Sequence, residues 1–90
     1  LGGSYGNLDK IIKICNKFKI KLILDAAHMA GTYHKGKHVG QESDVAVFSF
    51  QAVKNLPTAD SGMVCFKNKS LDKLARKLSW CGIDKDTFLR

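Results

Sequence analysis

Three polar residues that could take part in chemistry follow two short apolar runs. Asp25 comes directly after the run 20–24, while Ser49 and Lys54 stand at and beyond the end of the run 44–50. In open α/β sheets, ligands bind just beyond the carboxyl ends of the strands. If both runs are neighbouring parallel strands, we expect the three side chains to converge on one crevice. Asp25 could equally well cap a helix or form a turn, and its position alone leaves both roles open.

Lys54 is unusual because residues 45–59 contain no other charged side chain in a lysine-rich protein. A lysine surrounded by apolar groups loses its proton more readily, and the neutral amine is the form that makes an imine with a carbonyl compound. The alternative is the common one, in which a lone lysine is structural or simply solvated.

Two of the three histidines, His34 and His38, lie in a segment that is typical of a small hairpin turning at residues 35–36. With that turn, His34 pairs with Lys37 and Tyr33 pairs with His38, so the two imidazoles point to opposite faces. One metal ion cannot easily be held by both, and we therefore predict no metal site.

The elements that must position these residues alternate between helix and strand. Apolar residues at helical spacing predict a helix over 8–18, and the run 20–24 predicts a strand. The long, aperiodic stretch 25–43 is more typical of a functional loop than of an idle one. Two more strands are expected at 44–50 and 62–66, and Ser70 is the expected N-cap of a second helix that ends near 80–82. This order indicates an α/β sheet.

Composition and charge exclude several classes of protein. With 90 residues, 44% of them apolar and 26% charged, the chain is ordinary for a globular protein. No apolar run approaches the roughly 18 residues that a membrane-spanning helix needs. The net charge of +7 comes mainly from lysines spread evenly along the chain. We interpret them as surface solvation; a basic nucleic-acid-binding module is the alternative.

The cysteines indicate the compartment. Cys15, Cys65 and Cys81 are odd in number, far apart and set among apolar residues. This pattern predicts buried free thiols in a reducing, cytoplasmic environment. Because the chain starts at Leu1 and its last residues still look structured, we expect it to be a piece of a longer protein.

Three motifs carry a resemblance to a known family. They are Leu-Asp-Ala-Ala-His-Met-Ala-Gly-Thr at 24–32, Lys-Gly-Lys-His-Val-Gly at 35–40 and Val-Phe-Ser-Phe-Gln-Ala-Val-Lys-Asn-Leu at 47–56. Together they resemble the DegT/StrS family of aminotransferases of nucleotide-sugar biosynthesis, which depend on pyridoxal 5'-phosphate (PLP). The combined spacing of Asp-x-x-His, Ser-Phe-x-x-x-Lys and the following Asn-Leu is much more specific than any one motif.

The resemblance implies a fold and an assembly. Residues 1–90 would form the middle part of the PLP-binding large domain of a fold type I transferase, a mostly parallel sheet flanked by helices. The N-terminal part and the C-terminal small domain would lie outside these residues. The family also implies a homodimer whose active site is shared between subunits, with neither nucleic acid nor membrane as a partner, and it implies that this segment alone is inactive.

The resemblance also implies roles for five residues. Lys54 would form the internal aldimine with PLP and move the proton during transamination. Asp25 would pair with the protonated pyridine nitrogen, making the ring a stronger electron sink. His28 would lie at the ring or its phenolic oxygen, and Ser49 would donate to the cofactor phosphate. Ala27 is small, as expected where a flat ring packs closely.

The implied reaction moves an amino group from an amino acid, with glutamate the expected donor, to a keto group of a UDP- or dTDP-linked sugar. Sugar dehydratases of the same family are an alternative, but they replace the lysine with histidine. The sequence departs from the family at two places. Gln51 stands where His is common, and residues 59–62 replace a Gly-Glu-Gly-Gly-like turn.

Overall fold

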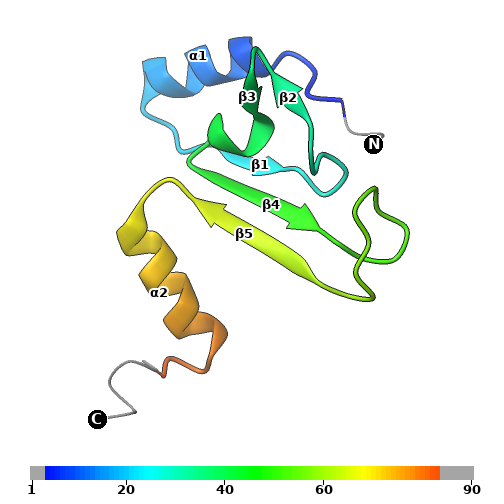
Figure 1. Cartoon of the computed structure of the whole chain (residues 1–90). Helices are drawn as coiled ribbons and strands as arrows, with labels where there is room; N and C mark the ends of the chain where they lie inside the picture. The colour runs from blue at the N-terminus through cyan, green and yellow to red at the C-terminus, as the bar shows by residue number, and fades with distance from the viewer. Residues whose placement is uncertain (1–3, 84–90) are drawn as a thin grey trace.

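The fold consists of a three-stranded sheet, a small separate hairpin and two helices (Figure 1). The computed structural model describes residues 4–83. In chain order its elements are α1 (Leu8–Phe18), β1 (Ile23–Asp25), β2 (Tyr33–His34), β3 (Lys37–His38), the 3₁₀ turn η1 (Val39–Gln41), β4 (Val45–Ser49), β5 (Gly62–Phe66) and α2 (Lys69–Ser79). All the expected helices and strands are present.

The sheet has the order β1-β4-β5 and is mixed. Strands β1 and β4 are parallel, with Asp25 opposite Val47, whereas β4 and β5 are antiparallel, with Ser49 opposite Gly62. Parallel neighbours need a long crossover, which the segment between β1 and β4 provides through the hairpin and η1. The loop between β4 and β5 contains no helix, so β5 returns beside β4. We expected a mostly parallel sheet. The three strands described here form one parallel pair, β1 and β4, and one antiparallel pair, β4 and β5.

Helix α1 has the bounds that the periodicity predicts. Leu8 is only 2% exposed and joins the core, and Ile12 packs against it. Asp9 in the first turn and Lys17 in the last complement the helix dipole. The helix ends at Lys19, whose φ of 55° lies in the left-handed region.

The hairpin has the predicted register, with Tyr33 opposite His38 and His34 opposite Lys37. Lys35 and Gly36 at the turn have φ values of 50° and 77°. Positive φ at both central residues is the geometry of a type I′ turn, which fits the twist of a two-residue hairpin.

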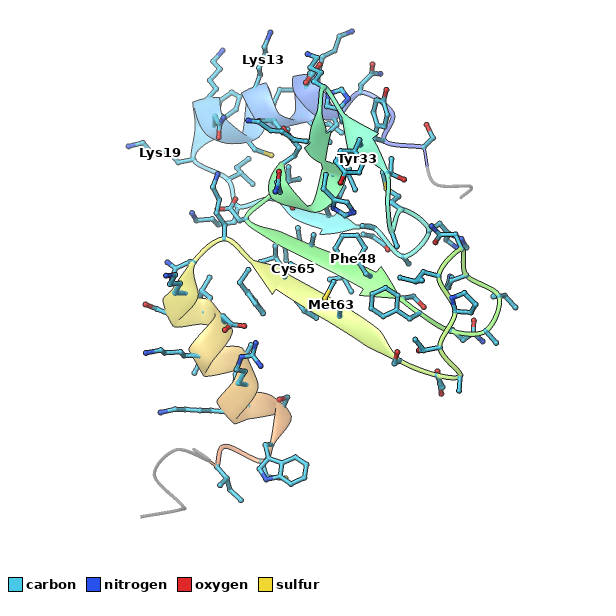
Figure 2. The ribbon with its side chains drawn as sticks, viewed as in Figure 1. Lys13, Lys19, Tyr33, Phe48, Met63 and Cys65 are labelled. Atoms are coloured by element: carbon cyan, nitrogen blue, oxygen red, sulfur yellow. The ribbon has the colours of Figure 1, made fainter. Side chains whose placement is uncertain are left out.

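The core lies between β4, η1 and the loop that follows β1. It consists of Leu8, Ala26, Met29, Val39, Ala46 and Phe48. Phe48 shares the sheet with Met63 and Cys65 of β5 (Figure 2). A Cβ atom at Gly40 would lie 2.9 Å from Phe48 Cζ, so the absence of a side chain in η1 lets the phenyl ring pack against that backbone.

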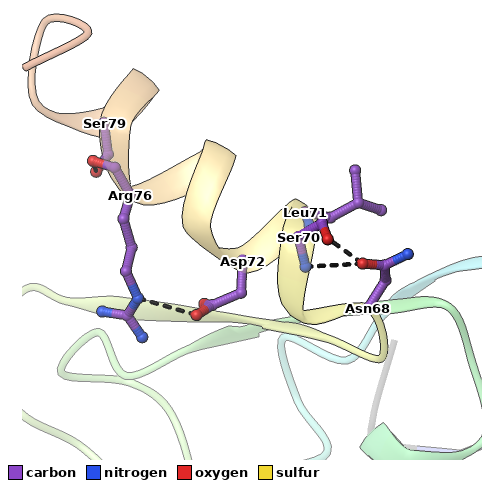
Figure 3. Close-up of polar contacts among 6 residues, drawn as sticks. All are labelled: Asn68, Ser70, Leu71, Asp72, Arg76 and Ser79. Atoms are coloured by element: carbon purple, nitrogen blue, oxygen red, sulfur yellow. Dashed lines mark hydrogen bonds and ion pairs between the residues drawn. The ribbon is translucent and has the colours of Figure 1, made fainter. Parts of the chain in front are cut away.

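The N-cap of α2 is Asn68, and our prediction of Ser70 was wrong. Asn68 Oδ1 accepts hydrogen bonds from the backbone nitrogens of Ser70 at 2.8 Å and Leu71 at 3.4 Å (Figure 3). Both residue types can cap a helix, but the chain becomes helical at Lys69, which leaves Asn68 in the capping position. The predicted end near 80–82 is confirmed, since Trp80 is the C-cap.

The cysteines differ from our prediction of buried thiols. All three are free, but Cys15 and Cys65 are only half-buried and Cys81 is exposed. Cys15 lies on α1, where Leu8 is the buried residue, and Cys81 follows α2, which has no buried residue. Apolar neighbours in the sequence therefore do not make these positions buried. Within residues 4–83, no helix is both long enough and apolar enough to cross a membrane.

Candidate functional site

The carboxyl ends of the two parallel strands lie at the same edge of the sheet. β1 ends at Asp25 and β4 ends at Ser49. The register places Asp25 opposite Val47, and the nitrogen of Ala26 donates to the Val47 carbonyl at 2.8 Å. Asp25 and Ser49 are therefore presented on one edge, which is the edge where open α/β sheets bind ligands.

Asp25 is exposed, and its carboxylate begins a turn. Its Oδ1 accepts a hydrogen bond from the backbone nitrogen of Ala27 at 3.1 Å. This contact is the turn-forming role that the sequence left open for Asp25. It also fixes the orientation of the carboxylate at the end of β1, and Ala27, half-buried beside it, contributes only a methyl group.

Lys54 and His28 come together although 26 residues separate them in the sequence. Lys54 Nζ lies 2.9 Å from His28 Nε2, so an ammonium at Lys54 can donate to the unprotonated ring nitrogen. The loop after β4 folds back toward the loop after β1, and the nitrogen of Lys54 donates to the Gln51 carbonyl at 2.9 Å within that loop. The structure thus places the sequence-predicted lysine and histidine in direct contact.

The apolar surroundings that we expected for Lys54 are not found in the part of the chain that the structure describes. Lys54 is half-buried, but Val53 is 77% exposed and Leu56 is 57% exposed. The buried apolar residues of the window, Ala46 and Phe48, belong to β4 and not to the loop that carries Lys54. His28, rather than an apolar pocket, is the neighbour of the amine.

Ser49 is half-buried at the end of β4, five residues before Lys54. Its Oγ accepts a long hydrogen bond from the nitrogen of Gln51 at 3.5 Å. The contact turns the chain out of the strand, and the hydroxyl hydrogen is left to donate elsewhere.

Sequence reasoning missed the part that Asn55 plays at this edge. Asn55 Nδ2 donates a hydrogen bond to the Ala30 carbonyl, which ties the lysine loop to the loop after β1. The signal was present, because Asn55 directly follows Lys54 in the motif, but the residue type alone does not reveal a partner 25 positions away.

A second polar cluster, also missed, joins α1 to the hairpin. Asp9 accepts hydrogen bonds from Lys35 Nζ at 2.6 Å and from His34 Nε2 at 3.0 Å, and these two contacts lower the pKa of the Asp9 carboxyl from 3.8 to about 2. The His34 ring is buried and packs against Tyr5, with ring centroids 4.4 Å apart. His38 lies on the other face of the hairpin, 5.6 Å from the Phe48 ring. In residues 4–83, no three His, Cys, Asp or Glu side chains are grouped so as to hold a metal ion.

The parallel pair β1–β4 and the flanking helices make this an α/β protein, with Asp25 and Ser49 at the carboxyl ends of the two strands. Of the three side chains expected to converge there, Lys54 contacts His28, whereas Asp25 and Ser49 make the local contacts described above. The model of the DegT/DnrJ/EryC1/StrS aminotransferase family matches residues 1–90, and the chain belongs to this family.

Two solved structures are similar to this chain. The aminotransferase TlmJ from Streptoalloteichus hindustanus matches with a TM-score of 0.88 and 37% identity over 93% of this chain. PseC from Helicobacter pylori, an aminotransferase involved in the biosynthesis of pseudoaminic acid, matches with a TM-score of 0.73 and 30% identity over 78% of this chain. The matches cover 23% of TlmJ and 19% of PseC, so this chain corresponds to a small part of each. Its mixed sheet with helices is consistent with a portion of a fold type I domain.

Proposed function

We propose that residues 1–90 are the middle part of the large domain of a PLP-dependent aminotransferase that acts on a keto group of a nucleotide-linked sugar. Glutamate is the proposed amino donor. Family membership supports the reaction class, and the role of PseC in making pseudoaminic acid supports the substrate class. The observation that carries the proposal is the contact between Lys54 and His28 at the carboxyl edge of the parallel strands.

The side chains at this edge fit the chemistry of PLP. An amine, a carboxylate and a hydroxyl are present on Lys54, Asp25 and Ser49, and Ala27 is small. When bound, PLP supplies an aldehyde carbon that joins to an amine and a ring that withdraws electrons from the substrate carbon. Asp25 would hold PLP at the ring nitrogen, Ser49 at the phosphate and His28 at the ring or its oxygen.

The side-chain atoms of Lys54, His28 and Asp25 indicate the role that each residue would have in the proposed reaction. Lys54 Nζ would accept a proton and return it, because an amine at the end of a long, flexible side chain can act as both base and acid. His28 Nε2 orients that amine through the contact at 2.9 Å. Asp25 Oδ1 already accepts from the Ala27 nitrogen, so the carboxylate has a fixed direction before any ligand binds.

Borohydride trapping of the intact protein with PLP tests the proposal. We expect peptide mass spectrometry to find the reduced adduct on Lys54. The matched variant Lys54→Ala should yield no adduct at this edge, yet should still bind PLP without a covalent bond, because phosphate anchoring rests on other residues. An adduct on a different lysine, or near-normal transamination by Lys54→Ala, would contradict the assignment.

We further propose that the intact protein is a cytoplasmic homodimer with a shared active site and that it binds neither nucleic acid nor membrane. Family resemblance supports the dimer, and the spread of lysines along the chain supports surface solvation. Sedimentation equilibrium of the intact protein measures its oligomeric state, and an activity assay at the same concentration measures transamination. A monomer that transaminates at full rate would exclude a shared active site.

A further inference from the structure

The loop that carries Lys54, residues 50–61, is closed at its base by backbone hydrogen bonds. The nitrogen of Phe50 donates to the Ser61 carbonyl at 2.8 Å, and the nitrogen of Thr58 donates to the Phe50 carbonyl at 2.6 Å. The Thr58 hydroxyl adds a contact to the same carbonyl at 3.2 Å. These bonds fix where the loop leaves and rejoins the sheet.

The tip of this loop, residues 51–57, has little apolar burial to hold it. Apart from the half-buried Lys54, its residues are all exposed. A segment with few buried contacts opens at low free-energy cost, so the position of such a tip depends on the individual polar contacts that it makes.

Two consecutive residues of the tip contact the loop after β1, residues 26–32. Lys54 contacts the His28 imidazole, and Asn55 donates to the Ala30 carbonyl. The Ala30 carbonyl, which accepts from Asn55, belongs to a loop that is held in place, because Ala26 and Met29 of the same loop are buried in the core. The nitrogen of Met29 also donates to the Ala26 carbonyl at 2.9 Å.

The two contacts differ in how long they can last. The Lys54 amine is the proposed reacting group, and it leaves His28 whenever it forms a bond to a ligand. The Asn55 amide bonds a backbone carbonyl that takes no part in the reaction, so this contact can persist throughout.

We propose that Asn55 is a positioning residue for Lys54, holding the tip of the lysine loop on the Ala30 carbonyl while the amine is engaged elsewhere. The role assigned to Lys54 rests on the proposed function, but the contact between the two loops does not. Asn55 itself touches no reacting atom in this arrangement.

Hydrogen exchange of the intact, cofactor-free protein tests whether Asn55 holds the tip. A neutral hydrogen bond contributes a net stabilisation that corresponds to roughly a 2- to 10-fold change in an opening equilibrium. We expect Asn55→Ala to speed exchange of the backbone amides of residues 51–56 by that factor. Asn55→Asp keeps the size but offers only an acceptor at neutral pH, so it should speed exchange at least as much.

The rate of adduct formation is the second measurement. Timed borohydride trapping with PLP should show Lys54 modified roughly 2- to 10-fold more slowly in Asn55→Ala than in the wild type. Asn68→Ala is the matched control, because it also removes a hydrogen bond between an Asn side chain and the backbone, but at the start of α2. It should lower the melting temperature without changing either measurement.

Unchanged exchange at residues 51–56 in Asn55→Ala would overturn the inference. Equal effects of Asn68→Ala on exchange and trapping would overturn it as well, since general loss of stability would then explain both. If wild-type Lys54 forms no adduct at all, the proposed function fails and Asn55 loses its proposed role in catalysis. The exchange comparison would still decide whether Asn55 joins the two loops.

Discussion

At the scale of single residues, the side-chain contact described for Lys54 is with His28. The amine lies 2.9 Å from His28 Nε2 on a loop whose apolar side chains point outward. Composition of the window 45–59 suggested an apolar pocket, but the orientation of a side chain on a loop depends on the path of the backbone. The chemistry proposed for Lys54 therefore depends on polar contacts at the sheet edge.

The substitution Asp25→Asn removes the negative charge of the side chain but keeps its size and shape. Asn keeps an oxygen that can accept from the Ala27 nitrogen, so the turn after β1 and the melting temperature should be preserved. We expect transamination by the intact protein to slow by several powers of ten, because a preorganised negative charge is lost. Steady-state kinetics with thermal unfolding as the control measures this. Activity like that of the wild type would remove Asp25 from the proposed site.

Asp9 makes a pH-dependent contribution to stability. Contacts with Lys35 and His34 hold its pKa at about 2, below the ordinary value of 3.8. A carboxyl group whose pKa is lowered by folding stabilises the folded state at pH values above its ordinary pKa. This contribution is lost as the pH falls from about 4 to about 2.

Asp9→Asn should therefore lower the urea midpoint of the intact protein at pH 7, and the difference from the wild type should disappear as the pH approaches 2. Asp60→Asn, in the exposed loop, is the matched control and should leave the midpoint at pH 7 unchanged. A difference between wild type and Asp9→Asn that grows as the pH falls would contradict this reading of the cluster.

At the scale of elements, the start of α2 shows how a cap is chosen. Asn68 and Ser70 are both good capping types, and Asn68 holds the position because its Oδ1 accepts from two backbone nitrogens (Figure 3). An Asp72–Arg76 pair at 3.0 Å, one helical turn apart, adds a small surface contribution.

Asn68→Ala should destabilise α2 by about 1 kcal/mol, the usual value of an N-cap, whereas Ser70→Ala should be nearly neutral. Hydrogen exchange of the α2 amides in the intact protein gives both values. If Ser70→Ala destabilised α2 more than Asn68→Ala does, Ser70 and not Asn68 would be the N-cap.

At the scale of the whole molecule, more large apolar side chains are exposed than are buried in the core of residues 4–83. Six apolar residues are buried in residues 4–83, whereas both helices and the outer strands expose large apolar side chains, including Phe18, Ile23 and Leu78. A folded protein normally covers apolar side chains that are exposed in such numbers. Because the chain matches about a fifth of TlmJ and PseC, we propose that the rest of a longer protein covers these faces.

The 90-residue chain, produced alone, is therefore expected to bind an apolar dye, to self-associate and to show no transamination. Dye fluorescence and light scattering measure the exposed surface, with the intact protein as the control. A monomer that leaves the dye unbound, or one that transaminates, would contradict the proposed division of the domain.

Local sequence patterns specify the helices and strands and their order along the chain. Helical periodicity predicts the helix over 8–18, a short apolar run predicts the strand over 62–66, and the turn at residues 35–36 predicts the hairpin register; all three are confirmed. These signals are reliable here because they act over only a few residues. The motifs at 24–32 and 47–56 also indicate the family, and they contain every residue of the candidate site that the resemblance implies.

The contacts between residues far apart in the sequence follow from the three-dimensional path of the chain. The contacts of His28 with Lys54, Ala30 with Asn55 and Asp9 with His34 each join residues about 25 positions apart. The antiparallel return of β5 and the outward direction of Val53 also depend on the path of the whole chain. Such pairings are set by how the loops fold back over the sheet, and no local pattern of side chains specifies that path.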